Sequence, residues 1–144
     1  MSTVILCPGQ GAQAVGMSKA WSESSEAARS IFERADSVLA DSLGAPLSQL
    51  CFEGPADTLN RTDVSQPAIY TASVACFAGW LDEANMTPSE LSIAATAGLS
   101  LGEYTALHLA DAFSFEDGLK LVALRGRAMQ DAAEAIDSSM VALI

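Results

Sequence analysis

The sequence predicts an α/β fold in which a parallel sheet is flanked by helices. Two short apolar runs, Val4–Cys7 and Ile93–Ala97, each end at a proline or glycine, as buried parallel strands do where they enter a loop. Longer stretches between and after them carry apolar residues at steps of three and four, which is the period of an amphipathic helix. Strands separated by helices are typical of a parallel sheet covered by helices.

The composition permits one domain and disfavours several classes of function. The chain has 144 residues, of which 50% are hydrophobic and 17% are charged, so it can bury a core. Its 7 basic and 18 acidic residues give a formal net charge of -11, which disfavours binding to nucleic acid. No apolar run approaches the roughly 18–20 residues that span a bilayer, and the start lacks the pattern of a signal peptide. We therefore expect no membrane insertion and a cytoplasmic location.

The cysteines and the single histidine predict neither disulfides nor a metal site. Cys7, Cys51 and Cys76 are odd in number, widely spaced and outside any CxxC motif, so reduced thiols are expected. With His108 as the only histidine, these residues form no recognisable set of zinc ligands. Cys7 is interpreted as a small core residue rather than as a second nucleophile. No cofactor is predicted.

The segment between the two strands is predicted to be helical. The periodic pattern covers about residues 17–40, with Ser24 or Ser25 as the candidate N-cap of a second helix inside that range. Residues 55–59 are predicted to form a short helix that opens with proline, and a long helix is predicted over about 66–85. The inward stripe expected for the long helix consists of Ile69, Ala72, Cys76, Trp80 and Ala84.

The second strand is followed by more helix. A helix is predicted directly after it, to about Leu109, and another over about 115–135. Residues 139–144 are expected to begin a further strand. The sequence contains no internal repeat and no low-complexity linker, so the chain is interpreted as a single unit or part of one.

A candidate nucleophile lies at the junction of the second strand and the next helix. Residues 98–102 read Gly-Leu-Ser-Leu-Gly, a GxSxG pattern with a small-residue strand before it and a helix after it. In that context the turn exposes the hydroxyl of Ser100, and the start of the helix supplies free N–H groups that stabilise an oxyanion. The alternative interpretation is a Gly-Ser-Gly turn that only caps the helix.

Four short sequence blocks carry a more specific signal. They are Pro8–Gln13 with Gly16-Met17, Gln66–Ala68, Gly98–Tyr104 and Leu124–Gln130. In this order and at these separations they resemble the malonyl-CoA:acyl carrier protein transacylases, the FabD type of fatty acid synthesis, over essentially the whole chain. The related acyltransferase domains of polyketide synthases share most of these blocks.

The resemblance implies a fold and an activity. Residues 1–137 would form the N-terminal part of an α/β-hydrolase-like large subdomain, which is incomplete here, and residues 138–144 would begin a ferredoxin-like small subdomain. Ser100 would accept a malonyl group from coenzyme A as an ester and pass it to the phosphopantetheine thiol of acyl carrier protein. The backbone N–H groups of Gln10 and Leu101 would form the oxyanion hole, and Arg125 would bind the malonyl carboxylate.

The helical pattern independently predicts an inward-facing Arg125. It shares a stripe with Leu121, Val122, Ala128 and Met129. Arg127 lies about 200° further round the helix and is expected in solvent. An inward guanidinium requires an anion, which is either a substrate carboxylate or an internal acid such as Glu103 in a structural ion pair.

Two departures from the family pattern affect the expected activity. Leu99 stands where the family usually has histidine, which removes a polar group beside the nucleophile. The lone histidine, His108, lies eight residues beyond Ser100 on one predicted helix, about 12 Å away at 1.5 Å per residue, so it is assigned to the helix surface or a satisfied core position. In the family the catalytic histidine comes from a later segment. The sequence is therefore interpreted as the N-terminal part of a larger enzyme.

Three alternatives to the fatty acid enzyme remain open at this point. The chain is interpreted equally as part of a polyketide synthase acyltransferase domain, because the two groups share the motifs. A generic serine esterase uses the same turn, but it gains nothing from a buried guanidinium. A fragment without a general base would keep contacts to acyl-CoA or carrier protein without turnover.

Overall fold

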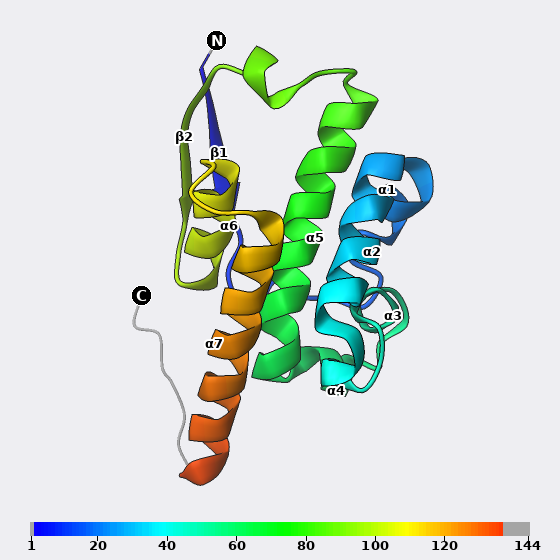
Figure 1. Cartoon of the computed structure of the whole chain (residues 1–144), viewed down its shortest axis with the longest axis vertical. Helices are drawn as coiled ribbons and strands as arrows, with labels where there is room; N and C mark the ends of the chain where they lie inside the picture. Colours follow the sequence, from blue (N-terminus) through cyan, green and yellow to red (C-terminus); the bar gives the residue numbers. More distant parts are fainter. Residues whose placement is uncertain (1, 137–144) are drawn as a thin grey trace.

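The computed structural model describes residues 2–136 and contains a two-stranded parallel sheet with helices packed against it. Strand β1 (Thr3–Cys7) pairs in parallel with β2 (Ile93–Gly98), and Cys7 lies opposite Gly98 in the register. The long connection between these strands is helical (Figure 1), so the α/β prediction with a parallel sheet is confirmed. The expected strand over 139–144 and the proposed boundary at residue 138 lie outside the described residues.

The helices follow the predicted order, with one addition. They are α1 (Lys19–Ser24), α2 (Glu26–Leu39), α3 (Leu47–Glu53), α4 (Ala56–Asn60), α5 (Thr62–Glu83), α6 (Leu101–Leu109) and α7 (Phe115–Ala135), with short 3-10 turns η1 (Ala40–Leu43) and η2 (Pro88–Glu90). Helix α3 was not predicted. Helix α5 begins four residues earlier than expected and accommodates Pro67 in its interior.

Helix α5 forms the centre of the molecule. Figure 1 shows it between α2 on one side and α6, α7 and the strands on the other. Its first turns are buried on nearly every face, including Gln66 and Tyr70, both 0% exposed. The predicted single inward stripe is therefore wrong at its end, where Trp80 is 40% exposed and Ala84 is exposed. The cause is geometric, because the last turns of α5 extend past α7 and have fewer neighbours (Figure 1).

The sheet is covered on one face by the described residues. Helix α6 packs against both strands, and the alternate residues Ile5 and Cys7 point toward the helices. Val4 and Leu6, on the opposite face, are 57% and 77% exposed. The apolar strand β1, expected to be buried, is thus exposed on this face among residues 2–136, in which no element packs on that side. No helix in this part of the chain is long and apolar enough to cross a bilayer.

The junction of α1 and α2 gives a first prediction, on stability. Ser25 is the N-cap of α2: its Oγ accepts from the Ala28 N–H at 3.2 Å and donates to Asp82 Oδ2 of α5 at 2.6 Å. We expect Ser25→Ala to lower the free energy of unfolding by about 1–2 kcal/mol in urea titrations. The control is Ser24→Ala, whose hydroxyl bonds only to carbonyls of its own helix. Equal losses in the two variants would contradict the cap.

Candidate active site

The predicted nucleophile lies on a strained turn between β2 and α6. Ser100 has φ 55° and ψ -107°, a conformation that residues other than glycine rarely adopt. The strand, turn and helix context expected for GxSxG is therefore present. A Cβ atom added at Gly102 would overlap the carbonyl oxygen of Cys7, and one at Gly98 would overlap the backbone of Gly102. Both glycines are required for the close approach of α6 to the strands.

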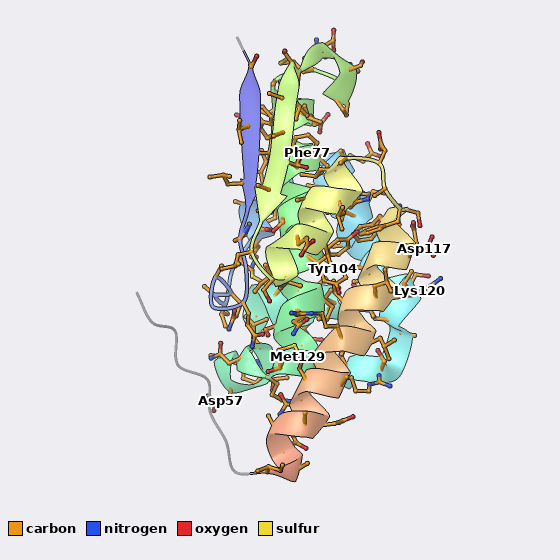
Figure 2. The ribbon with its side chains drawn as sticks, turned by 90° about the vertical axis from the view of Figure 1, so that its left-hand side faces the viewer. Asp57, Phe77, Tyr104, Asp117, Lys120 and Met129 are labelled. Atoms are coloured by element: carbon orange, nitrogen blue, oxygen red, sulfur yellow. The ribbon has the colours of Figure 1, made fainter. Side chains whose placement is uncertain are left out.

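Arg125 reaches this turn from α7. Its Nη2 donates to Ser100 Oγ at 2.8 Å, and its Nη1 donates to Gln66 Oε1 on α5 at 2.6 Å. The Cζ atom lies 5.7 Å from the ring centroid of Tyr104 on α6. Helices α5, α6 and α7 meet in this region. Figure 2 labels Tyr104 of α6 and Met129 of α7 on either side of it. The structure thus brings together two residues that are 25 positions apart in the sequence.

The inward orientation predicted for Arg125 agrees with the structure, but the stripe is narrower than expected. Arg125 is half-buried and Arg127 is exposed, as predicted. Leu121 is 45% exposed and Ala128 is also exposed, contrary to expectation. The buried line of α7 runs through Leu119, Val122 and Gly126, and it leaves Leu121 and Ala128 outside it. At Gly126 an added Cβ would lie 2.8 Å from the Thr62 carbonyl oxygen of α5.

The alternative of a structural ion pair is not observed. Glu103, the candidate partner, is exposed on α6. Within residues 2–136 the ion pairs join Lys19 to Glu23, Arg34 to Glu116 and Arg61 to Asp63, and none includes Arg125. The guanidinium beside Ser100 is therefore held by neutral groups and retains its charge for another anion.

The loop after β1 lies against the same region, through its side chains. Gln10 Nε2 donates to Thr62 Oγ1 at 3.3 Å, at the start of α5. The backbone N–H groups of Gln10 and Leu101 donate to no acceptor among residues 2–136. Leu101 begins α6, where free N–H groups and the positive end of the helix dipole coincide. Their role as oxyanion donors stays a prediction.

Sequence reasoning missed the part that Gln66 plays in this site. It belongs to the sequence block Gln66–Ala68, but the sequence alone indicated no role for it. Its side chain is fully buried and contacts Arg125, Met129 and Gln10. The available signal was a polar residue directly before Pro67. That pattern alone does not identify the partner.

The single histidine is not part of this arrangement. His108 Nδ1 lies 3.1 Å from the Phe113 carbonyl oxygen, and its ring is 6.0 Å from that of Tyr70. This agrees with the satisfied position expected for it, eight residues along α6 from Ser100. Leu99, beside the nucleophile, is 85% exposed and supplies no polar group. His108 is therefore not positioned to accept a hydrogen bond from Ser100.

The cysteines are free thiols and give a second prediction. Burial raises the pKa of Cys7, and burial together with the Asp36 carboxylate raises the pKa of Cys51 to about 12. At pH 8 a thiol with such a pKa is ionised to roughly one part in ten thousand, and the thiolate is the reactive form. We expect iodoacetamide to modify half-buried Cys76 first, as read by peptide mass spectrometry, and Cys51 only as the pH rises far above 9. Faster modification of Cys7 than of Cys76 would support the alternative that Cys7 is a second nucleophile.

Comparisons with known proteins show the family to which the chain is similar. Residues 4–143 match the family model of the acyl transferase domain. A malonyl CoA-acyl carrier protein transacylase of Bacillus subtilis is 41% identical over 139 residues, which are 96% of this chain and 41% of that protein. The structure of an acyl-carrier-protein-S-malonyltransferase from Bartonella henselae has a TM-score of 0.79 and 39% identity, and the match covers 91% of this chain and 40% of that one.

A further solved structure contains a type II PKS acyl-carrier protein in complex with its malonyl-transacylase. It has a TM-score of 0.76 and 36% identity, over 90% of this chain and 39% of that one. The present chain spans about two fifths of the length of the curated relatives it matches. The resemblance to FabD-type transacylases stated from the sequence blocks is thus confirmed, and so is the assignment to the N-terminal part. The chain belongs to the acyl transferase domain family.

Proposed function

We propose that this chain carries the nucleophile and the carboxylate-binding residue of a malonyl-CoA:acyl carrier protein transacylase. The observation that carries the proposal is the contact of Arg125 with Ser100 Oγ at 2.8 Å, made by a guanidinium without an acidic partner among the described residues. A guanidinium binds a carboxylate through two parallel hydrogen bonds. A malonyl group places its free carboxylate two carbons from the thioester carbonyl, which suits an anion site beside the nucleophile.

The proposed reaction proceeds through a serine ester. Arg125 exchanges its bond to Ser100 for the malonyl carboxylate, and Oγ attacks the thioester carbonyl carbon. The N–H groups of Gln10 and Leu101 stabilise the oxyanion, the carbon–sulfur bond breaks, and coenzyme A leaves as the thiol. The phosphopantetheine thiol of acyl carrier protein then attacks the ester, and Ser100 is regenerated. The base that takes the serine proton comes from outside the described residues.

Polyketide synthase acyltransferase domains would use the same residues, so the fatty acid assignment rests on the relatives named above. A generic esterase is the weaker candidate, since it has no use for a charged group at the acyl end. Without a general base for Ser100, the chain would bind acyl-CoA or carrier protein but would not turn over. A cytoplasmic location stays a prediction.

Acyl carrier protein is the proposed protein partner, by analogy with the complex named above. Carrier proteins are acidic, so their docking needs positive charge. On α7 the described residues offer Lys120 and Arg127, both exposed, while Arg125 is taken up by the site. Lys120 follows Asp117 by three residues on α7, and Figure 2 labels both near the start of that helix. The chain's net charge of -11 also leaves nucleic acid unsuited as a partner.

The proposal is tested by comparing thioesters that differ only in the carboxylate. By titration calorimetry we expect the chain to bind malonyl-CoA about tenfold or more tightly than acetyl-CoA, since hydrogen bonds to charged groups contribute about 1.5–3 kcal/mol. Intact mass spectrometry would show little malonyl-serine without an added base. Equal affinity for the two thioesters would favour the esterase, and rapid stable labelling of Ser100 would contradict the absence of a base.

A further inference from the structure

One buried amide at the site has no part in the reaction steps above. Gln66 of α5 is 0% exposed, yet its side chain contacts residues from α7 and from the loop after β1. Its Oε1 accepts from Arg125 at 2.6 Å, and its Nε2 donates to Met129 Sδ at 3.1 Å and to Gln10 Oε1 at 3.5 Å. A buried polar group with several partners is costly to disturb, so its position is well defined.

The orientation of this amide follows from its partners. A guanidinium can only donate hydrogen bonds, so the oxygen of Gln66 must face Arg125 and the NH₂ group must face Met129 and Gln10. The contact to Arg125 is short, as expected for a bond from a charged donor. The 3.5 Å contact to Gln10 is long for an N–H···O bond, so the connection to the loop is the weaker one.

The side chain of Gln66 is neutral, which suits it to hold Arg125 without neutralising its charge. A carboxylate at this position would pair with Arg125 and cancel the charge that a substrate anion needs. An amide oxygen also accepts a hydrogen bond from Nη1, but it leaves the positive charge of Arg125 intact. The ring of Tyr104 lies 5.7 Å from Cζ, and Nη2 remains directed at Ser100.

We propose that Gln66 is a positioning residue, a neutral tether that aims the Arg125 guanidinium at Ser100 and keeps its positive charge available for the carboxylate of the acyl group. This inference rests on the proposed function and deepens it. It makes Gln66 a determinant of selectivity for acyl thioesters that carry a carboxylate. Through Gln10, the same amide connects the carboxylate-binding residue to the proposed oxyanion loop.

The first test changes the charge of the tether while keeping its shape. In Gln66→Glu we expect the affinity for malonyl-CoA to fall about tenfold or more and the affinity for acetyl-CoA to stay the same, because an internal ion pair replaces the substrate carboxylate. Gln66→Met keeps the volume but removes the acceptor, and should reduce the malonyl preference about threefold to tenfold. The matched control is Gln49→Met, the same substitution at an exposed glutamine of α3. A Gln66→Glu chain that keeps the wild-type preference would overturn the proposal.

A second readout needs no substrate. In nitrogen-15 NMR of the ligand-free chain, the Nε–H of Arg125 should be ordered in the wild type and should become as mobile as that of exposed Arg127 in Gln66→Met. An Arg125 signal that Gln66→Met leaves unchanged would overturn the tether. A wild-type chain that binds both thioesters equally would contradict the proposed function and the selectivity role of Gln66, while loss of order in Gln66→Met would still support the tether.

Discussion

Removing the guanidinium in Arg125→Ala is expected to abolish the preference for malonyl-CoA over acetyl-CoA. The affinity for malonyl-CoA should fall about 10- to 100-fold, which corresponds to the contribution of one hydrogen bond to a charged group. The affinity for acetyl-CoA should change little, because its acyl group offers no carboxylate. Calorimetric titration of both thioesters measures the ratio directly.

Arg127→Ala is the matched control for this prediction. It removes the same charge from the same helix, but Arg127 is exposed and lies away from Ser100. Removing one positive charge also weakens the attraction between the chain and the phosphates of coenzyme A. This general effect is expected in both variants. An Arg125→Ala chain that still prefers malonyl-CoA would show that the carboxylate binds elsewhere.

Gly102→Ala is expected to produce a large loss of stability at the turn. The added Cβ would meet the carbonyl oxygen of Cys7 and lie 3.0 Å from that of Pro8. Both obstacles are backbone, so neither moves aside without shifting β1 relative to α6. We expect the free energy of unfolding in urea to fall by about 3 kcal/mol, the upper end for overpacking.

Gly44→Ala separates this clash from the general cost of replacing a glycine. Gly44 has φ 78° and no atom within 4 Å of an added Cβ, so its replacement costs only about 1–2 kcal/mol of backbone strain. If both variants lose the same stability, the close approach of α6 to β1 is not what requires glycine at position 102.

The elements around the nucleophile were predictable because their signals are local. The two strands are short apolar runs closed by Pro8 and Gly98, and α7 was predicted over its observed range from its periodic pattern. The GxSxG pattern then determined the turn, since it lies between a strand and a helix. Helix α3 was missed because seven residues between Pro46 and Gly54 contain fewer than two full periods.

The remaining features depend on contacts between distant segments. Arg125 and Gln66 are 59 positions apart, and no periodicity within α5 or α7 reveals that they meet. The exposure of Val4 and Leu6 likewise depends on which elements pack against the sheet, whereas their apolar character is a property of the strand alone. Residue type predicted that Arg125 needs an anion, but only the structure shows that neutral groups hold it.

The most direct test of the carboxylate site is a crystal structure of the chain with malonyl-CoA bound. The malonyl carboxylate should lie within hydrogen-bond distance of the Arg125 guanidinium, which has then left Ser100 Oγ. The thioester carbonyl carbon should lie within about 3.5 Å of that oxygen, the separation of a reactive geometry. A carboxylate bound by other groups, with the Arg125–Ser100 contact intact, would contradict the central claim.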